Sequence, residues 1–583
     1  MSLKERIFLI SIVFIFILIL LRLWQLQILN SEKYKKLSEQ NRVKIIKTQA
    51  PRGIIYDRNG IPLVENVTSF SLSVSAEYAE KIDVEILSKI LNISVEELRK
   101  KLSKKTESIY LPIKIKENLS FKEVVMLEAR KSQLPGIIIE INMKRYYPLG
   151  AATAHLLGYL GKITEEQFKK PDYQNIPSYF MVGQSGIEKF FDIQLRGIFG
   201  EKVIEVDALG REIRLLREIQ PFKGEDIYLT IDYFLQQAAY EALKDLTAAF
   251  VAIKPDTGEI LAMVSTPAFD PNRFVEGVED DYWRELINNP EKPMINRTIQ
   301  GLYPPGSIFK IVTAVAGLEE GVINPEKILV NCSGEISFGK WSFGCWRKEG
   351  HGAVDLKRAL VESCDIYFYE LGKILGIKNI YRYAKLLGLG SQTGLFSDEK
   401  SGLVPNEEWK KNTKNLPWYL GDTFNTAIGQ GFLRVTPLQM SVLIATVVNG
   451  GVRITPYIVK DQQPKKLNLN LNSENLEIIK KALAAVVNEP NGTAWTARSN
   501  LIKFGGKTGT VQVVSKKIKE KYKRKAFEHH AWFAGFAPLD KPEIAFAIIV
   551  EHGGGGGAVA APKVREILER YIIKKRELYV KDR

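Results

Sequence analysis

The chain has 583 residues, which is too long for one small domain and favours two or three. Hydrophobic residues make up 45%, and the 44 glycines and 25 prolines are ordinary numbers, so a disordered, collagen-like or low-complexity chain is excluded. The 82 lysines and arginines exceed the 67 aspartates and glutamates by 15, which suits an anionic neighbour such as phospholipid, cell-wall polymer or nucleic acid. Three cysteines exclude a disulfide-rich scaffold.

The first apolar stretch is a candidate membrane anchor. Ile7–Leu21 contains one polar residue, and after Arg22 the apolar pattern continues to Leu29. A membrane-spanning helix needs about 20 apolar residues, so the span reaches Leu29 if Arg22 snorkels to the interface. A cleaved signal peptide and a buried core helix are the alternatives, but no small-residue cleavage site follows the stretch. We expect an uncleaved anchor over residues 7–29, after a tail of residues 1–6.

The pattern of expected strands and helices changes near residue 245. Before it, strand-like runs such as Ser69–Val74 alternate with helical ones such as Asp83–Leu102, and Thr230–Leu246 reads as a helix. The second half is expected to contain a strand pair around the turn at 255–258, helices over Ser307–Leu318, Leu356–Leu375 and 558–573, and strands over Val511–Val514, Trp532–Ala537 and Glu543–Val550. Strands at both ends of this half with helices between them predict one mixed sheet sandwiched by helices.

Ser307 and Lys310 form the first of three short motifs in the second half. The preceding Pro304-Pro305-Gly306 places the start of a helix at or just before Ser307. Residues i and i+3 share a helix face, so we expect the Lys310 amine one turn from the Ser307 hydroxyl. A lysine whose pKa is lowered by burial or by another cation can take the proton of a serine. Alone the pair is a weak signal, because it arises by chance in most long chains.

Two further motifs follow in the chain. Ser363-Cys364-Asp365 is expected to direct its first and third side chains into one cleft from a loop between helices. Lys507-Thr508-Gly509-Thr510 supplies a cation, hydroxyls and backbone N–H groups, which suit a substrate carboxylate and an oxyanion. A phosphate-binding P-loop is excluded for this last motif, because it requires glycine at position 501, where the chain has leucine.

In this order the motifs resemble the active-site set of penicillin-recognising serine acyltransferases. In the first half, Pro51–Gly60, Gly183–Glu188 and Leu195–Gly197 resemble signatures of the non-catalytic pedestal of class B penicillin-binding proteins. The segments that look like those of penicillin-binding protein 2, the elongation type, are Gly429–Gly431, His530–Phe533 and the glycine run Gly553–Gly557. Asp365 favours the same type, since division-type members usually carry asparagine there.

The resemblance implies an α+β fold in several parts. After the anchor, we expect an elongated α+β pedestal over residues 30–245, a transpeptidase domain over 246–575 and a basic tail over 576–583. It also implies a short cytoplasmic N-terminus with the rest outside the inner membrane. The lysines that follow the anchor oppose that orientation by the positive-inside rule, so the topology depends on the resemblance.

The chemistry implied by the resemblance is peptidoglycan crosslinking. Ser307 would attack the penultimate D-alanine carbonyl of a stem pentapeptide and expel D-alanine, with Lys310 as base. Ser363 and Lys507 would pass the proton to the leaving amine, while the contact made by Asp365 stays open. In the third motif, Thr508 and Thr510, on either side of Gly509, would hold the substrate carboxylate, and the N–H groups of Ser307 and Thr510 would form the oxyanion hole. An amine of a neighbouring stem peptide then resolves the acyl-enzyme, and no cofactor is required.

The implied partners are donor and acceptor stem peptides, β-lactams, a RodA-type glycan polymerase and other elongation-complex proteins, with no nucleic acid. Three alternatives stay open at this point: a β-lactam sensor, a non-catalytic activator of the polymerase, and a D,D-carboxypeptidase. The sensor would need a signalling domain across the membrane, where only about six residues precede the anchor. The carboxypeptidase differs only in its acceptor, which would be water.

The three cysteines lie in one window of the second half, together with one of five histidines. Cys332, Cys345, His351 and Cys364 would make a closed Cys₃His set for structural zinc, although the spacing is not that of a zinc finger. Some penicillin-binding protein 2 relatives resemble this, with a metal site beside the second motif. The alternative is a Cys332–Cys345 disulfide with Cys364 buried and inert. Zinc is the favoured interpretation, and the ion would stabilise the loop that bears Ser363 and Asp365.

A basic run follows the third motif. Lys516–Lys525 holds seven basic residues and one acid, and its simplest interpretation is a solvated hairpin tip. The sharper hypothesis is a surface for anionic glycan strands or lipid headgroups near the cleft. His155, in contrast, lies in an apolar helical run and is expected to be a satisfied core residue.

Overall fold

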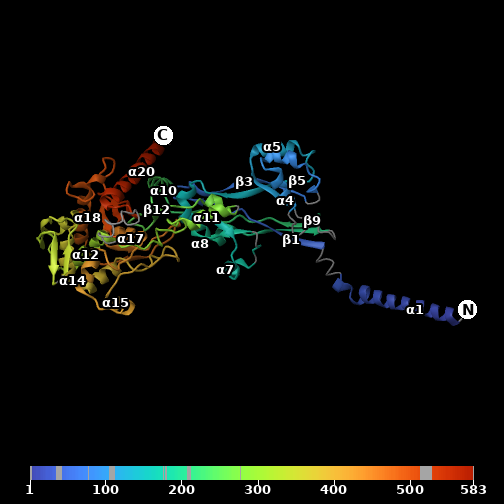
Figure 1. The fold of residues 1–583 in the computed structure, drawn as a ribbon, viewed down its shortest axis with the longest axis horizontal. Helices are drawn as coiled ribbons and strands as arrows, with labels where there is room; N and C mark the ends of the chain where they lie inside the picture. Colours follow the sequence, from blue (N-terminus) through green and yellow to red (C-terminus); the bar gives the residue numbers. More distant parts are fainter. Residues whose placement is uncertain are drawn as a thin grey trace.

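The computed structural model describes residues 3–34, 42–75, 78–103, 112–174, 176–177, 180–206, 212–275, 277–339, 341–512 and 528–581. The molecule is elongated: the N-terminal helix α1 lies at one end, a strand-rich region lies in the middle, and a helix-rich half that carries the C-terminus lies at the other end (Figure 1). The basic run Lys516–Lys525 lies outside the described residues.

Helix α1 (Leu3–Trp24) continues as a single π-helical turn, η1 (Gln25–Leu29). The segment Arg6–Leu29 is long and apolar enough to cross a membrane, and none of its most apolar window is buried against the rest of the chain. The alternative of a buried core helix is therefore wrong. Arg22 Nη1 donates to Gln25 Oε1 at 2.6 Å, so its charge is partnered where the apolar run is interrupted.

The middle region contains a three-stranded sheet and a five-stranded sheet. The first is antiparallel, in the order β1 (Val43–Thr48), β8 (Gly200–Val206), β9 (Glu212–Ile219). The second has the order β10 (Ile227–Tyr228), β2 (Ile55–Tyr56), β3 (Pro62–Val74), β4 (Ile113–Leu119), with β5 (Ile137–Tyr146) also paired to β3. Helices α3 (Val84–Leu91), α4 (Val95–Leu102) and α5 (Phe121–Ala129) enclose a small apolar core with this sheet. The expected strand Ser69–Val74 is confirmed as the end of β3.

One expected helix in this region is two helices. The run Asp83–Leu102 divides into α3 and α4 because Asn92 adopts the left-handed conformation (φ 53°) that ends α3. Ser94 then caps α4 by accepting the N–H of Glu97 at 3.2 Å. The spacing of apolar residues correctly predicted helix on both sides of the break, but the prediction of one continuous helix was wrong.

The segments that resemble pedestal signatures converge on one buried ion-pair network. Arg52 contacts Glu188 at 2.8 Å and Asp192 at 2.9 Å, Arg145 Nε contacts Glu188 at 2.7 Å, and Arg196 contacts Asp192 at 3.1 Å. All five side chains are buried. Burial raises the pKa of Glu188, but the two neighbouring guanidinium groups more than offset this and hold the pKa below its usual value.

Several short elements lie between β5 and β8. They are η3 (Gly150–Thr153), α6 (Ala154–Leu157), β6 (Leu160–Lys162), α7 (Glu165–Phe168), η4 (Pro171–Tyr173), β7 (Met181–Gly183), α8 (Gly186–Phe190) and α9 (Asp192–Arg196). This part packs directly on the helix-rich half. Phe190 stacks on Phe396 with ring centroids 4.9 Å apart, and His155 Nε2 lies 2.8 Å from the carbonyl oxygen of Pro293. The prediction that His155 is a satisfied residue is confirmed.

The helix-rich half is built on a five-stranded sheet in the order β12-β11-β21-β20-β19. Its strands are β11 (Ala248–Ile253), β12 (Ile260–Thr266), β19 (Gly505–Val511), β20 (His530–Ala537) and β21 (Ile544–Val550). Every pairing is antiparallel, so the expectation of a mixed sheet was wrong. Neighbouring strands are successive along the chain except where β21 returns against β11, and none of these pairs needs a parallel crossover.

Helices cover both faces of the sheet, as expected. One face carries α10 (Tyr233–Leu243) and α20 (Ala561–Lys581), which follows the turn η9 (Gly556–Ala560); the other carries α12 (Lys310–Glu319) and α17 (Pro437–Val448). The remaining elements are η5 (Pro271–Phe274), α11 (Asp280–Asn288), β13 (Val330–Cys332), β14 (Glu335–Phe338), β15 (Trp341–Gly344), β16 (Gly352–Val354), α15 (Glu407–Lys414), α16 (Leu420–Ala427), β17 (Val452–Ile454), β18 (Lys466–Asn468), α18 (Ser473–Asn488) and η7 (Trp495–Ala497).

The expected helix Leu356–Leu375 is also interrupted. Helix α13 (Leu356–Val361) is followed by helix α14 (Asp365–Leu386), which bends at Gly376. The break falls at Ser363, whose φ of 57° is incompatible with a right-handed helix. The predicted strand Val511–Val514 meets β19 at Val511, and residues 513 and 514 lie outside the described residues; β19 also contains the third motif itself.

Candidate active site

Ser307 lies in a short 3₁₀ turn, η6 (Gly306–Phe309), that leads directly into α12. The predicted helix start is therefore confirmed. Gly306 has a positive φ of 57°, its N–H donates to the carbonyl oxygen of Gly429 at 2.9 Å, and it faces the backbone of Thr510 on β19. A side chain at this position would be strained and crowded, so glycine lets the turn approach the strand. Ser307 itself is half-buried.

Lys310 is fully buried, and its amine has three oxygen acceptors. Its Nζ lies 2.7 Å from Asp365 Oδ1, 2.9 Å from the carbonyl oxygen of Ser363 and 3.2 Å from Ser363 Oγ. A lysine ammonium has three N–H donors and no acceptor, so these three oxygens satisfy it completely. The first and second motifs, 53 residues apart, are thus joined by direct contacts.

The second motif occupies the gap between two helices. Ser363 is held in the left-handed conformation and Asp365 is the first residue of α14, so both side chains face Lys310. The second carboxylate oxygen of Asp365 accepts the backbone N–H of Trp346 at 3.0 Å. Sequence reasoning missed Trp346; its only signal was its place directly after Cys345.

Lys507 lies on β19, the edge strand of the sheet, and is fully buried. Its Nζ donates to the carbonyl oxygen of Thr508 at 3.3 Å. Burial and the nearby charge of Lys310 hold the pKa of Lys507 well below its usual value, although Asp365 acts in the opposite direction. Lys507 is therefore a buried amine of lowered pKa beside a lysine that is paired with a carboxylate.

The rest of the third motif extends along the same strand. Thr508 is buried, and its hydroxyl is hydrogen-bonded to that of Thr493 at 2.8 Å. Gly509 packs against the backbone of Pro305, where a side chain would clash. Thr510 is exposed, its Oγ1 accepts the N–H of Gly556 at 3.2 Å and its carbonyl oxygen accepts from Gln430 Nε2 at 3.2 Å. The role of Thr493 was not anticipated, because no motif contains it.

The four metal-ligand candidates form one buried cluster beside the second motif. One ligand atom from each of Cys332, Cys345, His351 and Cys364 lies within 4.8 Å of the others. His351 Nδ1 is 3.5 Å from both the Cys332 and the Cys345 sulfur. Ligand atoms of a tetrahedral zinc site are separated by about 3.8 Å, so a small contraction would bring this set to bonding distance.

The chemistry of the cluster also suits a metal. All three cysteines are free thiols, so the predicted alternative of a Cys332–Cys345 disulfide is not formed in this structure. The Cys364 thiol donates to Cys345 and lowers the pKa of Cys345 to about 5, while that same pairing and burial raise the pKa of Cys364. Cys345 Sγ also accepts the N–H of Asp365 at 3.4 Å, which connects the cluster to the second motif.

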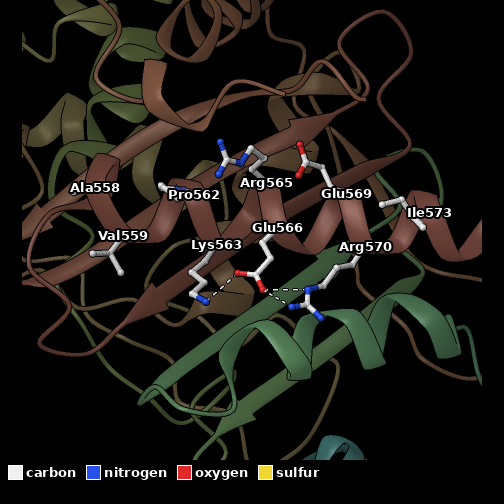
Figure 2. Close-up of a pocket in the computed structure, with 9 residues that line it drawn as sticks. All are labelled: Ala558, Val559, Pro562, Lys563, Arg565, Glu566, Glu569, Arg570 and Ile573. Carbon is white, nitrogen blue, oxygen red and sulfur yellow. Dashed lines mark hydrogen bonds and ion pairs between the residues drawn. The ribbon is translucent and has the colours of Figure 1, made fainter. Parts of the chain in front are cut away.

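A hollow along helix α20 is a different feature and holds none of the motif residues (Figure 2). Lys563 and Arg570 both point toward Glu566, at 2.9 and 2.8 Å, so these charges are paired with one another. The residues of the three motifs lie instead where η6, the loop that contains Ser363, and β19 meet.

Comparison with known proteins gives the same division of the chain. The penicillin-binding protein dimerisation domain matches residues 47–229, and the penicillin-binding protein transpeptidase domain matches residues 248–569. The chain belongs to the penicillin-binding protein family of transpeptidases. Its catalytic half is therefore a serine-type transpeptidase domain, and the resemblance inferred from the motifs is confirmed.

Relatives of this family cover nearly the whole chain. The peptidoglycan D,D-transpeptidase MrdA of Acinetobacter baumannii is 34% identical, over 98% of this chain and 88% of its own length. Penicillin-binding protein 2 of Helicobacter pylori, solved in complex with MreC, is 31% identical with a TM-score of 0.78, over 92% of this chain and 99% of that one. A chain from a solved peptidoglycan synthase complex is 31% identical with a TM-score of 0.75, over 97% of this chain and 98% of that one.

Proposed function

We propose that this protein is a membrane-anchored peptidoglycan D,D-transpeptidase that crosslinks stem peptides through a serine acyl-enzyme during cell elongation. Family membership supports the reaction class. The single observation that carries the proposal to residues is the contact of Lys310 with both Ser363 and Asp365, beside the turn that bears Ser307 and the strand that bears Lys507.

The nucleophile in this proposal is Ser307. Its Oγ bonds to the penultimate D-alanine carbonyl carbon, the peptide bond to the terminal D-alanine breaks, and its proton passes through Lys310, Ser363 and Lys507 to the leaving amine. A lysine ammonium has no acceptor lone pair, so Lys310 acts as the base in its neutral form. Lys507, whose pKa is lowered, is suited to pass a proton on to the leaving amine.

Substrate binding is assigned to the third motif. Thr508 and Thr510 would hold the terminal carboxylate, Gly509 would keep the strand close to the serine turn, and the N–H groups of Ser307 and Thr510 would receive the oxyanion. Gly306 supports this arrangement because it lies against the Thr510 backbone. An acceptor amine then attacks the acyl-enzyme and forms the crosslink.

The experiment is intact-mass spectrometry of the full chain in detergent with a fluorescent penicillin. One adduct per chain is expected, and Ser307→Ala should lose it. A folded wild-type protein that forms no adduct would contradict the proposal. Incubation with donor and acceptor peptides separates the acceptors: a crosslinked dimer indicates transpeptidation, whereas free tetrapeptide alone indicates the carboxypeptidase.

We further propose that Cys332, Cys345, His351 and Cys364 hold a structural zinc ion. Zinc with four protein ligands has no open position, so it would brace the fold and would not activate water. The N–H contact from Asp365 to Cys345 supports this role, because it links the cluster to the second motif. Catalysis itself is proposed to need no cofactor.

For the arrangement in the cell, we propose a cytoplasmic tail of residues 1–6, a single-pass inner-membrane anchor over 7–29, a pedestal over 30–245, a transpeptidase domain over 246–575 and a basic tail over 576–583, with everything after the anchor outside the membrane. The apolar helix supports the anchor. A RodA-type polymerase and other elongation proteins are proposed partners, supported by relatives solved with MreC and in a synthase complex.

A further inference from the structure

Trp346 is an exposed aromatic side chain that is nevertheless held in place. Its side chain is 59% exposed, yet its indole N–H donates to the carbonyl oxygen of Glu362 at 3.0 Å. The ring also meets the imidazole of His351 edge to face, with centroids 5.7 Å apart. A fixed aromatic face loses little conformational entropy when something packs on it, which is the property of a binding surface.

The backbone of Trp346 lies beside a residue proposed to be catalytic. The backbone N–H of Trp346 bonds to one oxygen of Asp365, and the other oxygen of that carboxylate bonds to Lys310. Trp346 therefore belongs to the wall formed by the second motif, whereas Thr508 and Thr510 belong to β19. The backbone N–H and the indole N–H of Trp346 both form hydrogen bonds within the protein. Neither hydrogen bond requires the face of the ring to be exposed to solvent.

The position of the reacting bond limits what can reach this face. In the proposed function, the terminal carboxylate lies at Thr508 and Thr510 and the scissile carbonyl lies at Ser307. Trp346 contacts Asp365 of the second motif, so it is tied to a different part of the site from the β19 residues assigned to the terminal carboxylate. The part of a donor peptide able to pass this wall is the segment that precedes the D-alanyl-D-alanine end.

Resting on the proposed function, we propose that the exposed indole face of Trp346 is a substrate-binding surface that packs against the stem-peptide residues preceding D-alanyl-D-alanine. It makes Trp346 a specificity-determining residue for long donors. Such a contact is made equally in the ground state and in the transition state, so it acts on KM and leaves kcat unchanged.

The test compares two donors on the full chain in detergent: a stem pentapeptide, and an N-acetylated D-alanyl-D-alanine that lacks the preceding residues. Trp346→Ala should raise KM for the pentapeptide roughly tenfold, the scale expected for loss of one aromatic packing contact, and should not change KM for the short donor. Trp346→Phe keeps a ring and should stay within about threefold of wild type. Both variants keep the backbone N–H that binds Asp365.

Trp341 provides the matched control. It is 75% exposed and lies at the start of β15, at the opposite end of that strand from Cys345, so Trp341→Ala should leave both KM values unchanged. Melting temperature and bound zinc establish that each variant is folded. If Trp346→Ala is destabilised, Trp346→Leu replaces it and should show the same selective loss.

Two outcomes overturn the inference. One is an unchanged pentapeptide KM in Trp346→Ala or Trp346→Leu, and the other is an equal change for both donors. A change in the acceptor KM alone also contradicts the donor assignment. Failure of the proposed function looks different, because the wild-type protein would then form no penicillin adduct at Ser307.

Discussion

Lys310 Nζ lies 2.7 Å from Asp365 Oδ1, and two oxygens of Ser363 complete the contacts of the buried amine. Lys310 and Asp365 therefore form a direct ion pair. Lys507 lies on strand β19, and its amine is hydrogen-bonded to a backbone carbonyl oxygen and not to a carboxylate. Its pKa is lowered by burial and by the charge of Lys310. The site therefore holds two lysines in unlike environments, which is a common arrangement for moving a proton.

Asp365→Asn should move the acidic limb of the pH–acylation profile toward lower pH. Asp365 raises the pKa of Lys507, so its removal lets the amine become neutral at lower pH. The measurement is the rate of penicillin adduct formation across pH. Asp422→Asn is the control, because it removes the carboxylate beside Lys410, a different buried lysine, and should leave the profile in place. An unshifted limb in Asp365→Asn would contradict this reading of the lysine pair.

Glu188→Gln should destabilise the pedestal strongly. The variant removes the carboxylate that serves Arg52 and Arg145 and leaves two buried guanidinium groups short of a partner. Breaking a buried ion pair costs about 3–5 kcal/mol, which denaturant unfolding of the full chain would detect. Glu128→Gln breaks an exposed pair with Lys131 and should cost no more than about 1 kcal/mol. Equal effects of the two variants would show that the network is not a stabilising centre.

Stability should fall as the pH is lowered from about 6.5 to about 4, partly through His155. Burial lowers the pKa of His155 to about 4, so the folded protein keeps this residue neutral while the unfolded chain already binds a proton near its usual value of 6.5. The contribution is thus complete above pH 6.5 and lost on acidification. His155→Gln can still donate to the Pro293 carbonyl but does not titrate, so its melting temperature should depend less steeply on pH. Identical slopes would contradict the assignment.

Metal analysis of the purified chain should find one equivalent of zinc, and Cys345→Ser should lose most of it. The same variant should form the penicillin adduct more slowly, because Asp365 and Trp346 lose the support of the cluster. His155→Gln is the control for metal content, since it changes a histidine outside the cluster. Thiol titration of the denatured, unreduced protein separates the two interpretations: three thiols fit the metal site, and one thiol would establish the disulfide.

The sequence determined the parts of this protein that depend on local chemistry. The length of the apolar stretch predicts the helix Arg6–Leu29, the spacing of Ser307 and Lys310 predicts a shared turn, and the order of the three motifs predicts the family. The four candidate metal ligands were also correctly grouped, because they are the only cysteines of the chain and a nearby histidine. Each of these signals is either a pattern within a short stretch of sequence or the presence of a residue type that is rare in this chain.

Tertiary structure decided what depends on residues far apart in the chain. The helix breaks at Asn92 and Ser363 require a positive φ, which asparagine and serine adopt only where the surrounding contacts favour it. The antiparallel pairing of β11 with β21 joins strands about 300 residues apart, and no local pattern encodes strand direction. The partnership of Asp365 with Lys310 and with the Trp346 N–H arises in the same way, because the fold brings three separate segments to one carboxylate.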